Sequence, residues 1–128
     1  MPSMKARRRR QTRRAPAPDA VFAYVTCADP TQAERLARAV VEARLAACAN
    51  ILPGMRSLYR WQGRIESARE VVLILKTRRS LVPALTARVK QLHSYTVPCV
   101  CVLPIVGGNA DYLRWLMDET AAPARRRR

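Results

Sequence analysis

The chain has 128 residues, of which 49% are hydrophobic, and a formal net charge of +15 at pH 7. This length is typical of a single domain, and no apolar run is long enough to predict a membrane-spanning helix. Four cysteines are too few for a disulfide scaffold, and no apolar signal segment follows the first charges, so we expect reduced thiols in a cytoplasmic protein.

The basic residues gather at the two ends of the chain. Residues 1–18 contain seven of the 24 lysines and arginines and no acid, and residues 125–128 are four further arginines. We predict that residues 1–18 and 121–128 are disordered tails and that residues 19–120 form the folded domain. Three roles stay open for the N-terminal arm: a solvated extension, an arm that binds nucleic acid or another polyanion, and a transit peptide.

The first predicted elements are a buried strand over residues 20–27 and a helix over residues 29–50. The strand is rich in Val, Phe, Tyr and Thr and ends at Cys27. The helix has apolar residues at helical spacing, and Asp29 can cap its start. This assignment places Cys48 near the end of the helix.

Two long strands follow, over residues 51–61 and 64–77, with a turn at Gln62 and Gly63. Pro53 and Gly54 interrupt the first strand, which indicates an edge strand or a bulge. Strands in small domains usually have about five or six residues. So long a hairpin is expected to project as an arm that packs on a partner.

The remaining elements are a helix within residues 79–94, a strand within 97–105 and a short helix over 110–120. The order βαββαβ, followed by a C-terminal helix, predicts an α+β domain of the ferredoxin-like, split βαβ type. Helices cover one face of such a sheet. The chain has too little left to cover the other face, so we expect it to form oligomers.

The stretch HSYTVPCVC (residues 93–101) is the first candidate site, because it contains the only histidine, His93, and two cysteines. Cys99 and Cys101 are two apart in a predicted strand and so point to one face. Cys27 is expected nearby, since the first and last strands are neighbours in this topology. Thiolates and imidazole suit copper and zinc. The alternative is structural: buried cysteines act as small apolar residues, and a histidine at a helix end contacts the last carbonyls.

A second candidate surface lies near the hairpin turn, where Tyr59 and Trp61 can pack against another subunit or bind a small ligand or partner. Glu66 and Glu70 share one face of their strand beside neighbouring arginines, so ion pairing is a better expectation for them than catalysis. The sequence has no nucleotide-binding glycine motif, no paired CxxC and no assignable catalytic triad. We therefore predict a protein that is not an enzyme and has no organic cofactor.

Four segments together resemble the CutA divalent-cation tolerance family: TCADPTQAERLARAVVEARLAACANIL, SLYRWQGRIESAREVVLILKT, HSYTVP and YLRWL. The similarity runs in order from about residue 20 to about residue 118. It implies a ferredoxin-like subunit in a homotrimer whose long hairpins wrap neighbouring subunits. It also implies a role in tolerance or response to divalent metals, copper especially. The alternative is a non-enzymatic trimeric scaffold, or a small-effector-binding module similar to the P-II signalling proteins, with polyanion-binding arginine tails.

Some residues of this chain match the motifs of that family. Cys48 matches the cysteine of its AAC segment, Trp61 matches its W-E-G turn, and His93 and Tyr95 match its HPY segment. The family also has a glutamate where this chain has Cys99. That difference disfavours a hard cation and favours a softer ion such as Cu(I) or zinc.

The residues and the resemblance together predict two sites. The predicted ligands of copper, or of zinc, are Cys27, Cys48, His93, Cys99 and Cys101. The predicted intersubunit or ligand cleft is formed by Tyr59, Trp61, Glu66, Lys76 and Tyr95.

Overall fold

The computed structural model describes residues 19–120, and the predictions made for the two arginine-rich tails lie outside these residues. The described elements are β1 (Ala20–Cys27), α2 (Pro30–Glu42), β2 (Cys48–Trp61), β3 (Arg64–Arg78), η1 (Arg79–Leu81), α3 (Val82–Leu92), β4 (Val100–Pro104) and α4 (Ala110–Thr120). This order confirms the predicted α+β fold with a split βαβ arrangement and a C-terminal helix.

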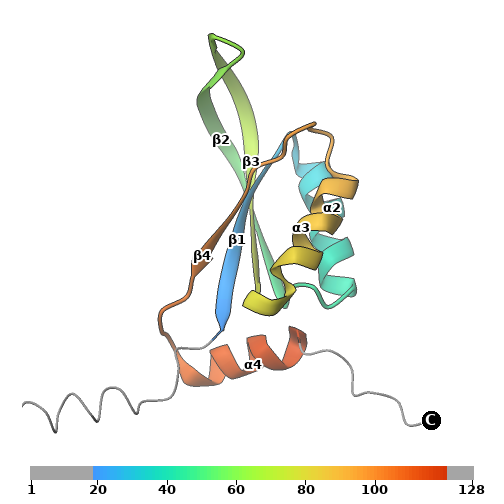
Figure 1. The fold of residues 1–128 in the computed structure, drawn as a ribbon, viewed down its shortest axis with the longest axis vertical. Helices are drawn as coiled ribbons and strands as arrows, with labels where there is room; N and C mark the ends of the chain where they lie inside the picture. Colours follow the sequence, from blue (N-terminus) through green and yellow to red (C-terminus); the bar gives the residue numbers. More distant parts are fainter. Residues whose placement is uncertain (1–18, 121–128) are drawn as a thin grey trace, which may run out of the picture.

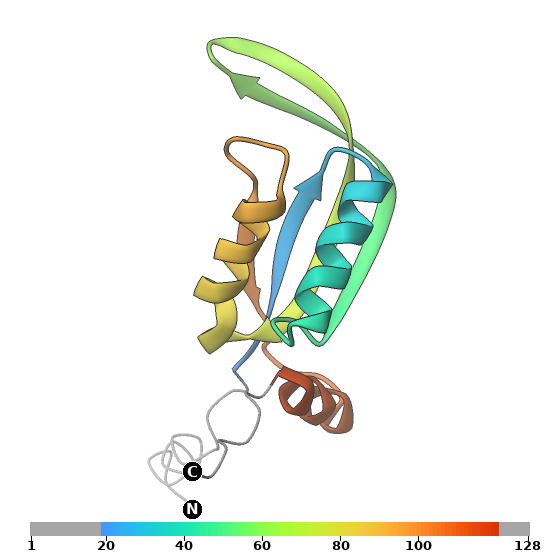
Figure 2. The ribbon, with the colours of Figure 1, turned by 90° about the vertical axis from the view of Figure 1, so that its right-hand side faces the viewer.

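The four strands form one antiparallel sheet in the order β2-β3-β1-β4. Helices α2 and α3 lie side by side over one face of the sheet, and α4 lies across its lower end (Figures 1 and 2). Alternate residues of β1 point toward the two helices and are fully buried. The residues of α2, β3 and α3 that pack around them are also buried. This core includes Ala23, Val25, Cys27, Leu36, Val40, Leu73, Leu75, Leu85 and Val89.

The opposite face of the sheet, which we call the open face, has no cover from α2 or α3. Residues there include Tyr24 on β1 and its partners across the strands, Ile74 on β3 and Cys101 on β4. Helix α4 covers only one end of it, where Leu113 and Leu116 pack on Ala20. Large apolar side chains such as Leu52, Leu58, Ile65 and Leu103 stay exposed on the sheet and hairpin. Oligomerisation therefore stays a prediction, and the uncovered sheet face supports it.

Strands β2 and β3 form the long hairpin that the sequence predicts, with 14 and 15 residues, and it extends well beyond the rest of the sheet (Figure 1). At its tip Gln62 has φ 50° and Gly63 has φ 79°. Two successive positive φ values are typical of a type I′ turn, whose twist matches that of the strands. The predicted bulge is also present, between Leu52 and Met55.

The first helix is shorter than predicted. Asp29 caps its start by accepting a hydrogen bond from the backbone N–H of Gln32 at 2.8 Å, but the helix ends at Glu42 rather than near residue 50. Arg44 then adopts φ 61°, and the N–H of Ala47 donates to the carbonyl of Lys76 at 2.8 Å. The alanine-rich composition favours helix, but pairing with β3 prevails.

Two further element boundaries differ from those that the sequence predicts. Cys48 is the first residue of β2 rather than the end of a helix. The strand expected within residues 97–105 is confined to Val100–Pro104, so that Cys99 precedes it. Among residues 19–120, none of the helices has the length and apolar character that a bilayer crossing requires.

Candidate functional site

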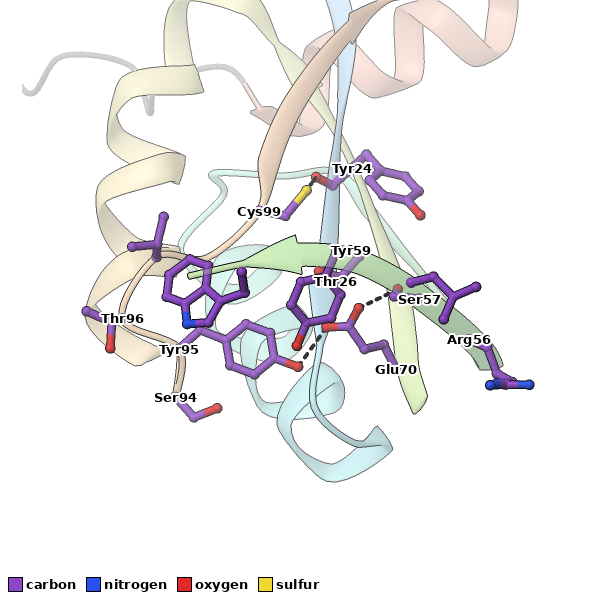
Figure 3. A pocket seen from close by; sticks show the side chains of 13 residues that line it. Tyr24, Thr26, Arg56, Ser57, Tyr59, Glu70, Ser94, Tyr95, Thr96 and Cys99 are labelled. Carbon is purple, nitrogen blue, oxygen red and sulfur yellow. Dashed lines mark hydrogen bonds between the residues drawn. The ribbon is translucent and has the colours of Figure 1, made fainter. Parts of the chain in front are cut away.

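A pocket of about 790 Å³ lies between the outer half of the hairpin, β1 and the loop after α3 (Figure 3). Four aromatic side chains line it: Tyr24 from β1, Tyr59 and Trp61 from β2, and Tyr95 from the loop. The long hairpin thus supplies one wall and the α3–β4 connection the other. The pocket has the size and mixed apolar and polar lining of small-molecule sites.

Glu70 of β3 is the one carboxylate in the described lining of the pocket, and only 8% of its surface is exposed. Ser57 Oγ donates a hydrogen bond to Glu70 Oε1 at 2.6 Å, and Tyr95 Oη donates to Glu70 Oε2 at 2.7 Å (Figure 3). Such short bonds to a carboxylate are stronger than bonds between neutral groups. Glu70 therefore joins the hairpin to the loop after α3.

The predicted ion pairing of Glu66 and Glu70 is wrong for the part of the chain that the structure describes. The ion pairs within residues 19–120 involve neither glutamate. Arg69 is adjacent to Glu70 along β3, and adjacent residues of a strand point to opposite faces. Neutral hydroxyl groups, rather than guanidinium groups, donate to the buried Glu70.

Burial and Glu70 together change the acidity of two neighbouring groups. Burial raises the pKa of the Tyr95 phenol above its ordinary value, and the hydrogen bond to Glu70 raises it further. Burial also raises the pKa of the Cys27 thiol to about 11, with smaller contributions from the charges of Glu70 and Asp29. Tyr95 is therefore a neutral donor at pH 7, and Cys27 a neutral thiol.

Cys99 and Cys101 lie on the open face with their Sγ atoms 3.9 Å apart. Cys101 pairs across the sheet with Tyr24, and Cys99 Sγ lies 4.0 Å from the Tyr24 carbonyl oxygen. Cys99 also belongs to the lining of the pocket. Burial raises the pKa of the Cys99 thiol, and the hydrogen bond with Cys101 adds to this effect. The structure thus brings together two of the five predicted metal ligands on one side of the sheet.

His93 is buried and has a partner on each ring nitrogen. Its Nε2 lies 2.8 Å from the carbonyl oxygen of Thr26, and its Nδ1 accepts a hydrogen bond from the Tyr95 N–H at 3.0 Å. These partners assign the proton to Nε2 of a neutral imidazole. In this arrangement His93 ties the end of α3 to β1 and positions Tyr95, which is a structural role.

The two remaining predicted ligands are separated from the cysteine pair, Cys27 by the sheet itself and Cys48 by the width of the sheet. Cys27 is part of the core against the helices, on the face opposite to Cys101. Cys48 pairs with Lys76 on the far side of the sheet, about 14 Å from β4 at the usual strand spacing. Within residues 19–120, no three His, Cys, Asp or Glu side chains lie close enough to hold a metal ion.

Some of the predicted cleft residues line the pocket and others do not. Tyr59, Trp61 and Tyr95 line the pocket, whereas Glu66 and Lys76 lie outside its lining. Lys76 Nζ donates to Tyr112 Oη of α4 at 3.2 Å. Sequence patterns did not indicate Ser57 and Tyr24 as site residues, and they indicated only ion pairing for Glu70. The isolated acid directly before the apolar run VVLIL is the one sequence signal for Glu70.

The chain is similar in sequence to known proteins. The family described as CutA1 divalent ion tolerance protein matches residues 21–119. The rice (Oryza sativa subsp. japonica) protein "Protein CutA 1, chloroplastic" is 47% identical over 100 residues, which cover 78% of this chain and 56% of the rice protein. The chain thus spans about half the length of the plant and mammalian relatives it matches.

Two solved structures have the same fold. The divalent cation tolerance protein Cut A1 from Thermus thermophilus matches with a TM-score of 0.78 and 45% identity, covering 80% of this chain and 99% of that one. The structure described as the periplasmic divalent cation tolerance protein CutA from Archaeoglobus fulgidus matches with a TM-score of 0.77 and 39% identity, covering 80% and 99%. The matched segment of the family includes both the pocket and the cysteine pair.

Proposed function

Because this chain belongs to the CutA1 divalent ion tolerance protein family, we propose that it acts in tolerance to divalent metal ions and binds a soft ion, copper or zinc, directly. We propose further that it acts as a non-enzymatic homotrimer in the cytoplasm.

The observation that carries the metal proposal is the 3.9 Å separation of the Cys99 and Cys101 sulfurs. At the Zn–S length of about 2.3 Å, both sulfurs can ligate one ion with an S–metal–S angle of roughly 115°. Thiolates are soft ligands that favour Cu(I) and zinc over hard cations. Zinc usually takes four ligands, whereas Cu(I) also forms trigonal sites with three. The pair therefore suits Cu(I) better, because Cu(I) would need one further ligand.

The pair is also poorly placed to form a disulfide. Residues i and i+2 of an extended strand are about 6.6 Å apart at Cα, close to the upper limit for a disulfide. An ion between the sulfurs needs less movement of the strand than a covalent bond of about 2.05 Å. The geometry therefore favours metal capture over oxidation of the pair.

The uncovered sheet face and the projecting hairpin support the proposed self-association. Leu58 and Ile65 near the hairpin tip are 71% and 64% exposed, which is unfavourable for an arm in water. Packing of these side chains on another copy of the chain would remove them from solvent.

The test is titration of the full chain with Cu(I) and with Zn(II) without oxygen. We expect submicromolar binding of one ion per chain, lost in both Cys99→Ser and Cys101→Ser. The matched controls are Cys27→Ser, on the opposite face, and Cys48→Ser, on the far strand, and both should bind normally. The affinity should rise with pH, because a thiol must lose its proton before it ligates a metal ion. Full binding in either of the first two variants would contradict the proposed site.

The pocket favours a second function, the binding of a small effector. Its lining combines four aromatic side chains with a buried carboxylate and several hydroxyl groups. The arginine tails add a proposed interaction with nucleic acid or another polyanion, supported by their charge alone.

A further inference from the structure

The pocket contains a buried negative charge that lacks a positive partner within residues 19–120. Glu70 is 8% exposed, and its hydrogen-bond donors among the described residues are the two neutral hydroxyl groups of Ser57 and Tyr95. A buried carboxylate is unfavourable unless it is paired or fully hydrogen-bonded. Each of its oxygens has a second acceptor position, so Glu70 can still accept bonds from a ligand.

The one arginine of the described lining does not supply the missing charge. The guanidinium of Arg56 donates to Ser67 Oγ at 3.0 Å. Arg56 pairs with Arg69 across the hairpin, one position along β3 from Glu70, so its side chain leaves the opposite face of the strand. Figure 3 shows the guanidinium directed away from Glu70. The interior of the pocket therefore has a net negative character.

Four aromatic rings line the same pocket as this charge. They belong to Tyr24, Tyr59, Trp61 and Tyr95 (Figure 3). The faces of aromatic rings attract cations, and tryptophan attracts them most strongly. In a single copy of the chain Trp61 is 47% exposed and Tyr59 is 44% exposed, so a ligand seated against the two rings can contact them, with a neighbouring copy of the proposed trimer covering the remainder.

We propose that this pocket binds a small organic ammonium ion, with its nitrogen near Glu70 and its carbon atoms against Trp61 and Tyr59. The inference rests on the second function proposed above, the binding of a small effector, and names the chemical class of that effector. A volume of about 790 Å³ is ample for such a molecule. A hard divalent cation fits less well, because it needs six or more oxygen ligands and the described lining offers one carboxylate.

The test is calorimetric titration of the full chain with choline and with putrescine. The matched probes without charge are 3,3-dimethylbutan-1-ol for choline and butane-1,4-diol for putrescine. We expect saturable binding of at least one amine and weaker binding of its neutral counterpart. Glu70→Gln should reduce amine affinity by at least about tenfold, while Glu66→Gln, outside the pocket lining, should not change it.

A second variant and a metal control keep the test decisive if Glu70→Gln disturbs the fold. Trp61→Leu changes an exposed ring at the hairpin and should weaken amine binding several-fold. Glu70→Gln should still bind Cu(I), and the Cys99→Ser, Cys101→Ser double variant should still bind the amine. Failure of the metal proposal is thereby separated from failure of this one.

Three results would overturn the inference. The first is that neither amine binds. The second is that Glu70→Gln binds the amine as tightly as the unchanged protein does. The third is equal affinity for a neutral probe and its amine, which would keep the effector site but exclude recognition of the charge.

Discussion

Removal of the Tyr95 hydroxyl by Tyr95→Phe tests the link between the hairpin and the loop after α3. The substitution deletes one O–H that donates to Glu70 Oε2 at 2.7 Å. The aromatic ring stays in place beside His93, whose ring centroid is 4.6 Å away. The change is thus confined to one hydrogen bond.

The expected loss follows from the burial of Glu70. A hydrogen bond to a charged group contributes about 1.5–3 kcal/mol to stability, and a buried acceptor that loses its donor adds a desolvation cost. Ser57 would be the only described donor left to Glu70. We expect Tyr95→Phe to lower the free energy of unfolding by about 2 kcal/mol.

The assay is urea unfolding at one fixed protein concentration, because self-association changes apparent stability. The control is Tyr112→Phe, whose hydroxyl accepts an exposed bond from Lys76 and should contribute less than about 0.5 kcal/mol. A double-mutant cycle with Glu70→Gln should show a coupling of at least about 1 kcal/mol. Equal losses for Tyr95→Phe and Tyr112→Phe, or an undiminished loss in the Glu70→Gln background, would refute the reasoning.

Two further predictions concern the core and the hairpin tip. Because the folded state holds the pKa of Cys27 near 11 against an ordinary value of 9.0, the unfolded chain ionises first as pH rises above 9. The free energy of unfolding should then fall by about 1.4 kcal/mol per pH unit between pH 9 and 11, relative to Cys27→Ala, and parallel pH profiles would count against this. Gly63→Ala should cost about 1–2 kcal/mol in urea unfolding, because Gly63 has φ 79°. Gly107→Ala, in open space without positive φ, should cost little, and an equal cost for the two would argue against the type I′ turn.

Most of the fold could be predicted because its signals are local. The apolar strands, the Gln62–Gly63 turn and the Asp29 cap each depend on a few neighbouring residues. The helix end was wrong because residues 43–49 favour helix locally, whereas the structure turns after Glu42 and pairs residues 47–49 with β3. Local sequence patterns do not report the free energy of strand pairing, because that free energy comes from contacts with residues about 30 positions away.

The site was less predictable because its contacts are made between distant segments. Tyr95 and Glu70 are 25 residues apart, and His93 and Thr26 are 67 apart. Spacing correctly placed Cys99 and Cys101 on one side of the sheet, since that depends on strand alternation alone. The same alternation, applied to Arg69 and Glu70, would have excluded their ion pair.

Strand alternation also decides how a larger metal site could arise in this fold. Cys27 is on the helix face, Cys48 is three strands from β4, and His93 uses both ring nitrogens. A third His, Cys, Asp or Glu ligand for an ion at Cys99 and Cys101 would therefore come from another copy of the chain, from outside residues 19–120, or from rearrangement. If the pair acts alone, binding stays at one ion per chain at every protein concentration. If another copy completes the site, affinity rises with assembly, so titrations at several protein concentrations distinguish the two arrangements.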